Sequence, residues 1–158
     1  MVRWLTPPED RAWRGYRRMR TLLDLQLARD LAADSGLSEP DYDVLSTLSE
    51  APGDRWRASA LAARLLWSSS RLAHQVGRME RRGLVARRAV DSDGRGAEVV
   101  LTERGRAVLE AAAPAHLESV RRHLVDLLSP AEVDALAAIA TKVVRHLDGD
   151  VPQVDPGG

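Results

Sequence analysis

Apolar residues recur at steps of three and four positions along most of this 158-residue chain, the spacing that gives an α-helix one apolar face. In the first half, the steps predict four helices at about residues 9–33, 38–51, 60–65 and 68–82. Gly36 and Gly83 follow the first and the fourth, where a left-handed residue commonly ends a helix. Ser38 precedes the second, where its hydroxyl can cap the first turn.

The period changes after Gly83. Residues 84–90 and 97–101 are short runs rich in β-branched and apolar residues, and the six residues between them, Asp-Ser-Asp-Gly-Arg-Gly, have the composition of a turn. These runs predict a β-hairpin. Two helices follow, over 103–128 with an irregularity near Pro114, and over 130–147. The tail 148–158 is expected to be disordered.

This order predicts a mostly α-helical fold with a small β-wing, in which a winged helix-turn-helix lies between two sets of longer helices. We expect a single domain over residues 1–147, with the winged module at about 38–102. The outer helices, at about 9–34 and 103–147, have apolar stripes too long to bury on so small a module. An identical chain is the commonest partner for such stripes, so the pattern predicts a homodimer.

Composition adds a charge pattern. The 23 basic and 23 acidic residues balance, but residues 54–106 have 12 basic and 6 acidic side chains, whereas both flanking segments are acidic. A basic surplus confined to one segment is typical of a nucleic-acid-binding module, although a solvated surface would also produce it. Cysteine is absent, which excludes thiol chemistry. No apolar stretch suits a signal peptide or a membrane span, so we expect a cytoplasmic protein without membrane contact.

The helix at 68–82 has the face that would read double-stranded DNA. At roughly 100° per residue, Leu72, Val76 and Met79 share one edge, and polar, mostly cationic residues occupy the opposite arc with Gln75 at its border. Arginine can pair with guanine and glutamine with adenine in the major groove, while serines and backbone amides approach phosphates. The expected DNA-binding residues on this helix are Ser68, Ser69, Ser70, Arg71, His74, Gln75 and Arg78.

The hairpin loop offers a second contact. Arg95 lies between two glycines at the tip, and a guanidinium suits the negative potential of a narrow minor groove. Asp93 could brace it or a neighbouring arginine. The alternative is an ordinary turn with a solvated arginine.

The segments Trp67–Val85, Asp91–Gly96 and Val100–Arg106 together resemble the MarR family of bacterial transcriptional regulators, with Leu66 where many members have glycine. The resemblance covers about residues 9–147 and implies an obligate homodimer whose fourth helix enters the major groove. Members are commonly repressors that are released by small aromatic or anionic ligands. The crevice between the first helix and the winged module is the expected ligand site, with Trp13, Tyr16, Arg17 and Tyr42 near it, although Trp13 and Tyr16 could instead pack in a core or a dimer interface.

No enzyme site is expected. Ser70 and His74 lack an acid to orient the imidazole, and a convex helix offers no oxyanion pocket. No cofactor motif occurs. His116 and His123 lie seven positions apart on one helix and leave metal binding open. The other functions to weigh are a sequence-blind architectural DNA-binding protein and a winged-helix module that binds proteins.

Overall fold

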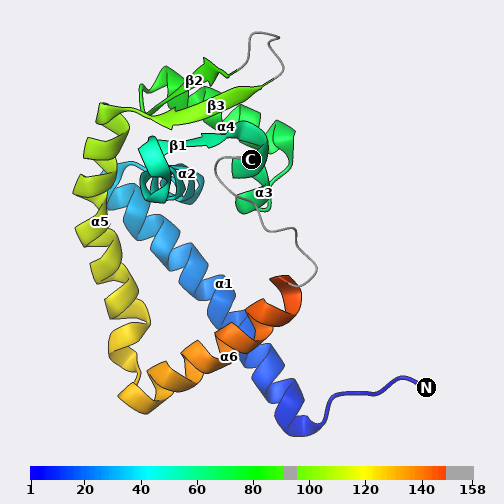
Figure 1. The fold of residues 1–158 in the computed structure, drawn as a ribbon. Helices are drawn as coiled ribbons and strands as arrows, with labels where there is room; N and C mark the ends of the chain where they lie inside the picture. Colours follow the sequence, from blue (N-terminus) through cyan, green and yellow to red (C-terminus); the bar gives the residue numbers. More distant parts are fainter. Residues whose placement is uncertain (91–95, 149–158) are drawn as a thin grey trace.

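The computed structural model describes residues 1–90 and 96–148 and contains a small sheet at one end of the molecule, from which long helices extend (Figure 1). The elements in chain order are α1 (Pro7–Ser35), α2 (Glu39–Glu50), the 3-10 turn η1 (Pro52–Asp54), β1 (Arg55–Arg57), α3 (Ala58–Arg64), α4 (Ser69–Arg81), β2 (Val85–Ala89), β3 (Ala97–Leu101), α5 (Glu103–His123), the 3-10 turn η2 (Val125–Leu127) and α6 (Pro130–Asp148). The predicted winged helix-turn-helix order is confirmed. No helix among the described residues is long and apolar enough to cross a membrane.

Local sequence explains where the helices begin. The Ser38 hydroxyl accepts a hydrogen bond from the Asp41 amide, the Ser68 hydroxyl from the Arg71 amide, and the Thr102 hydroxyl from the Gly105 amide. Each interaction satisfies a backbone donor that has no partner within its helix. Gly36 ends α1 in the left-handed conformation, with φ of 69°, as its position in the sequence predicts.

The sheet has three strands, one more than the sequence pattern predicts. β3 is central and pairs antiparallel with both β1 and β2. Trp56 of β1 lies opposite Val99, and both side chains are buried. β1 has only three residues, too few to show the alternation by which a strand is recognised in sequence.

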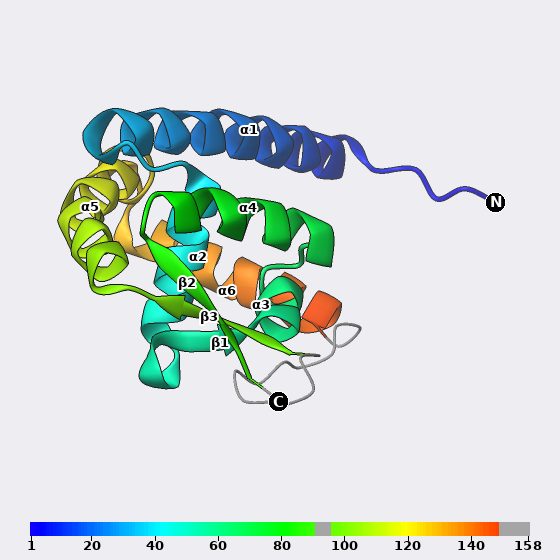
Figure 2. The ribbon, with the colours of Figure 1, turned by 90° about the horizontal axis from the view of Figure 1, so that it is seen from above.

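The core lies between the sheet, α2, α3 and α4. Val44, Leu45 and Leu48 of α2 are fully buried, as are Leu61 of α3 and Met79 of α4. The wing and α4 thus share one hydrophobic core, which fixes the angle between them (Figure 2).

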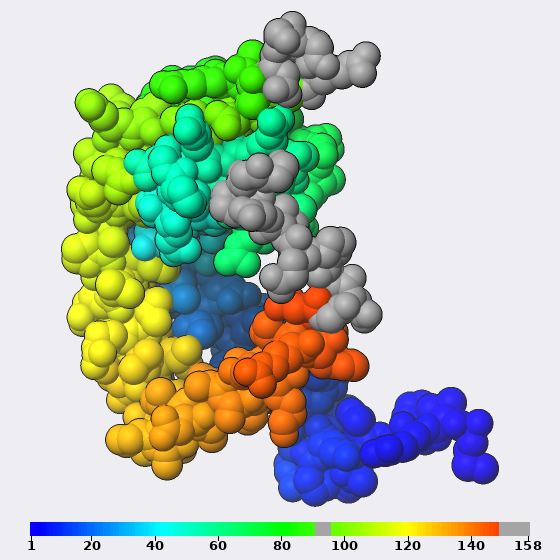
Figure 3. Space-filling view, viewed as in Figure 1, coloured from blue at the N-terminus to red at the C-terminus, as the bar shows by residue number. Residues whose placement is uncertain are grey.

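The outer helices leave this core. α5 runs from the sheet beside the C-terminal part of α1. α6 turns back from the far end of α5 and passes in front of α1 in the view of Figure 1, whereas Figure 2 shows the two helices on different sides of the molecule. The helix predicted to reach residue 128 ends at His123, so that part of the prediction is wrong; η2 makes the corner before α6. Every residue of α6 is exposed, and Figure 3 shows the helix on the surface at the edge of a hollow bounded by α5.

Candidate nucleic-acid interface

The two faces of α4 differ in burial. Leu72, Val76 and Met79 are buried, as the helical period predicts. The opposite arc carries exposed side chains that are, except for one serine, basic or imidazole groups: Ser70, Arg71, His74, Arg78 and Arg81. Ser69 is also exposed but lies on the side of Leu72 and Val76, where it lines a cavity. Ser68, the N-cap, is exposed beside the basic arc. The N-terminus of a helix adds unpaired amides and a partial positive charge, so this surface suits a phosphate backbone.

Gln75 does not lie on the exposed face. Its side chain is 3% exposed, and its Nε2 donates a hydrogen bond to Asp41 Oδ1 at 2.7 Å. The prediction that its amide lies within reach of a base is therefore wrong for this arrangement, because a partner 34 residues earlier in the chain binds it. Gln75 Oε1 accepts a hydrogen bond from Arg78, so the buried amide also restrains a residue of the exposed face.

Asp41 is the centre of this buried polar cluster. Its Oδ2 accepts hydrogen bonds from Arg82 Nη1 at 2.7 Å and from the Ser38 amide at 3.0 Å. Although burial alone would raise the pKa of Asp41, the hydrogen bonds from Ser38 and Arg82 and the charge of Arg82 hold it below its ordinary value. Arg82 also approaches the Gly36 carbonyl at 3.4 Å, so the cluster joins the end of α1 and the start of α2 to α4.

At the N-terminal end of α4, the guanidinium of Arg71 lies over the ring of Trp67, 4.2 Å from its centroid. Trp67 is half-buried against the core. The preceding residue, Leu66, has a left-handed φ of 56°. Leu66 therefore adopts the left-handed conformation that usually favours glycine, although it has a side chain.

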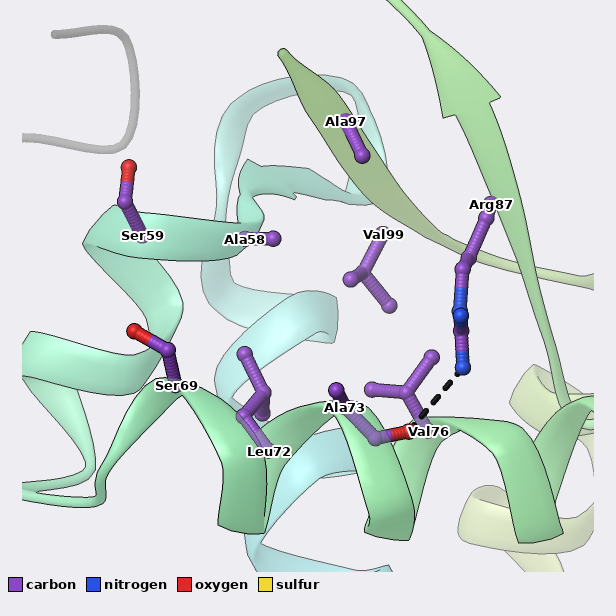
Figure 4. Close-up of a pocket in the computed structure, with 9 residues that line it drawn as sticks. All are labelled: Ala58, Ser59, Ser69, Leu72, Ala73, Val76, Arg87, Ala97 and Val99. Atoms are coloured by element: carbon purple, nitrogen blue, oxygen red, sulfur yellow. Dashed lines mark hydrogen bonds between the residues drawn. The ribbon is translucent and has the colours of Figure 1, made fainter. Parts of the chain in front are cut away.

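β2 is fixed to α4 by Arg87. Its Nη2 donates to the Ala73 carbonyl at 2.9 Å, and its backbone amide donates to Glu80 Oε1 at 3.1 Å (Figure 4). A cavity of about 220 Å³ opens between α3, α4 and the sheet, with small side chains such as Ala58 and Ala97 on its walls. Asp93 and Arg95, the wing residues expected to bind DNA, lie outside the described residues.

The structure does not bring the expected ligand residues together in one chain. Trp13 stacks on Tyr16 with centroids 6.0 Å apart, and the Arg17 guanidinium lies 5.9 Å from the Trp13 ring. Tyr42 contacts His116 of α5 instead, at 4.5 Å between centroids. About 22 residues of α1, some 33 Å of helix, separate Trp13 from the end near Tyr42.

The two histidines considered for metal binding have different neighbours. His116 packs on Tyr42, and its Nδ1 is buried without a hydrogen-bond partner among the described residues. His123 Nε2 lies 3.0 Å from Asp30 Oδ2, which also accepts a 2.6 Å hydrogen bond from Ser119. These hydrogen bonds, led by that of Ser119, lower the pKa of Asp30. No group of three potential ligands of a metal ion occurs among the described residues.

An exposed cationic helix, held by a short helix and a turn on one side and by a sheet on the other, defines a winged helix-turn-helix DNA-binding protein. Residues 35–96 match the family described as the MarR family. The transcriptional regulator HosA of Escherichia coli is 30% identical over 132 residues, covering 84% of this chain and 96% of HosA. The chain belongs to the MarR family of transcriptional regulators, which are DNA-binding proteins and not enzymes.

Solved structures agree with this assignment. AbsC, a MarR family regulator of Streptomyces coelicolor, is 44% identical, with a TM-score of 0.86 over 94% of this chain and 99% of AbsC. Sco3205 of the same organism, solved in complex with DNA, is 37% identical, with a TM-score of 0.87 over 99% of this chain and 96% of Sco3205.

Proposed function

We propose that this regulator is a homodimeric repressor that binds a pseudo-palindromic operator and is released from it by a small molecule. The exposed cationic face of α4 is the observation that carries the proposal. Ser68, Ser69 and Ser70 approach phosphates, Arg71 reads a base edge, and His74 and Arg78 flank it. Gln75 is left out of this DNA-binding set, because its buried side chain donates a hydrogen bond to Asp41.

The exposed apolar faces of the outer helices support the dimer. α6 presents Leu136, Ile139 and Val143 to solvent, with exposed fractions of 36%, 61% and 50%. A groove of about 470 Å³ between α1 and the corner after α5 adds further apolar surface, including Met19, Leu22 and Leu127. A second copy covers both. Its α4 would then reach the next major groove, which sets the half-site spacing at about 10 base pairs.

The proposed wing contact rests on Arg95 in the loop between β2 and β3, with Asp93 bracing it or a neighbouring arginine. A guanidinium at this position would enter the minor groove beside the half-site. Arg95→Ala should weaken binding mainly to duplexes with A·T-rich flanks. Equal weakening on G·C-rich flanks would place Arg95 on phosphates instead.

Selection of duplexes from a random library by the full-length protein, followed by gel-shift titration against unselected competitor, tests the function. A repressor of this kind selects an inverted repeat and binds it at least about a thousandfold more tightly than competitor. The log–log slope of affinity against salt should reach about −0.9 for each phosphate neutralised. Binding without a selected motif would indicate an architectural protein, and no binding would favour a protein-interaction module.

A ligand site at Tyr42 and His116 fits the geometry best. The buried and unpaired Nδ1 of His116 lies next to an aromatic ring, so a phenolic or carboxylic acid would supply the missing hydrogen-bond partner. Trp13, Tyr16 and Arg17 would join this site only from the second protomer. With no cysteine in the chain, thiol oxidation is not the signal.

Release of the selected duplex by phenolic acids, followed together with tryptophan quenching, tests the ligand. Tyr42→Ala should remove the response while leaving DNA affinity intact. A response retained in Tyr42→Ala would show that the ligand binds elsewhere. If no acid at millimolar concentration releases the duplex, DNA occupancy would be regulated by the amount of protein alone.

A further inference from the structure

Trp67 and Arg71 form a pair at the start of the proposed recognition helix. The guanidinium lies 4.2 Å from the centre of the indole ring, within the range of a cation–π contact. The ring itself is held in place, because Trp67 packs on the core and its backbone amide donates to the Ala62 carbonyl at 2.8 Å. The arginine therefore rests on a surface that belongs to the rigid part of the module.

The stack occupies only the face of the guanidinium. Its five N–H groups lie in the plane of the group and point outward, away from the ring below. Within residues 1–90 and 96–148, no group accepts a hydrogen bond from the Arg71 side chain. By contrast, Arg78 donates to Gln75 and Arg82 donates to Asp41. Arg71 thus combines a fixed face with a free hydrogen-bonding edge.

The Asp43 carboxyl of α2 interacts electrostatically with Arg71. Burial raises the pKa of the Asp43 carboxyl in α2, and the positive charges of Arg71 and His116 act in the opposite direction. The Arg71 guanidinium therefore lies in the field of Asp43 as well as on the Trp67 ring. An arginine restrained before it meets DNA loses less side-chain entropy on binding.

We propose that Trp67 is a specificity-determining positioning residue, which orients Arg71 so that its free edge pairs with O6 and N7 of a guanine in the major groove. The proposal rests on the proposed function, since it assumes that the α4 face meets base edges. On this proposal, the discrimination at one base pair of each half-site depends on an indole ring that itself contacts no base. Trp67 acts through Arg71 and not through a contact of its own.

The test uses full-length dimers of the wild type and of Trp67→Phe, Trp67→Leu, Arg71→Lys and Arg71→Ala. Trp4→Leu is the matched control, because Trp4 is 84% exposed before α1. Each protein selects a motif from a random duplex library, and affinities are then measured for the wild-type motif and for duplexes changed at one symmetric pair of positions. Melting temperature and the salt slope are recorded for every variant.

We expect Trp67→Leu to reduce discrimination at a single position by about fivefold per half-site, with the salt slope unchanged, and Trp67→Phe to retain most of it because a ring remains. Arg71→Lys should lose preference at the same position, since an ammonium keeps the charge without the planar fork. Trp67→Leu should cause no further loss in an Arg71→Ala background. Trp4→Leu should leave the motif unchanged.

Two results would overturn the inference. In the first, Trp67→Leu selects the wild-type motif at every position, which would show that the stack does not contribute to base discrimination by Arg71. In the second, Arg71→Lys keeps the wild-type base preference. This result would exclude bidentate pairing of the guanidinium with a guanine, even if Trp67→Leu fails to fold. If the wild type selects no motif, the proposed function itself fails.

Discussion

Leu66 carries local backbone strain in the turn before α4. Its φ of 56° lies in the left-handed region, which costs a residue with a Cβ about 1 kcal/mol or more, and its side chain is 74% exposed and recovers little of that by packing. We expect Leu66→Gly to raise the free energy of unfolding by up to about 1 kcal/mol, as measured by denaturant titration. Leu66→Ala is the control, because it removes the same exposed side chain but keeps the Cβ. Equal stability of the two variants would contradict the strain.

Gly105 is required by close approach and not by its backbone angle. A Cβ at this position would meet the Leu84 carbonyl oxygen at 2.0 Å and Leu101 Cδ1 at 2.9 Å. Gly105→Ala should therefore lower the free energy of unfolding by about 1–3 kcal/mol or more, because the backbone at Leu84 or at the start of α5 must move to make room for the Cβ. Gly15→Ala is the matched comparison, because Gly15 has nothing within 4 Å in the chain. A Gly105→Ala protein as stable as Gly15→Ala would show that α5 can shift without cost.

At the scale of elements, Asp41 couples α4 to the corner between α1 and α2. Its lowered pKa means that the folded state binds the proton less readily than the unfolded state, so the stabilisation is present above about pH 4 and is lost as the pH falls through the folded pKa. Asp41→Asn should cost about 1–3 kcal/mol near pH 7 and progressively less below pH 4. Thermal unfolding of both proteins from pH 2.5 to 7 measures the difference, and a gap independent of pH would exclude the carboxylate as its cause.

Elements with a clear period were predictable, and contacts between distant elements were not. The burial of Leu72, Val76 and Met79 follows from spacing along one helix. Gln75 lies at the border of that face, and only its partner Asp41, supplied by the packing of α2, decides that it points inward. β1 was missed because three residues do not define a period.

The DNA-facing surface was predictable to a similar degree. Exposed Ser70, Arg71 and His74 follow from the helical period, since they lie opposite the buried edge. The stack of Arg71 on Trp67 was not predictable in this way. Trp67 lies before the first residue of α4, so the helical period does not fix the direction of its side chain. The separation of Trp13 from Tyr42 depends on the length and direction of α1, which no local pattern contains.

At the scale of the whole molecule, the proposed dimer predicts different effects for two positions on α6. Ile139 and Thr141 lie on opposite sides of the helix, and both are exposed in the single chain. Ile139→Asp should produce monomers or aggregates, whereas Thr141→Asp should leave the dimer intact, as followed by light scattering and by the concentration dependence of the melting temperature. A folded, monodisperse wild-type monomer, or a dimer that tolerates Ile139→Asp, would contradict this use of α6.

Removal of residues 1–34 tests the other half of that interface. Loss of α1 exposes the face of α5 that packs against it, including Ser119, whose partner Asp30 is removed. We expect the shortened chain to aggregate or unfold, as judged by circular dichroism and sedimentation. A stable, soluble and monomeric product would show that the winged module and α5 need neither α1 nor a partner.

The apolar face of α6 and the cationic face of α4 lie in separate parts of the chain, and this separation has a genetic consequence. A copy with Arg71→Ala keeps its pairing surface and should still associate with normal copies. When the two are made in equal amounts, random pairing leaves about one quarter of the dimers with two intact reading helices. The altered allele should therefore be dominant in a reporter strain, whereas an allele that also carries Ile139→Asp should be recessive.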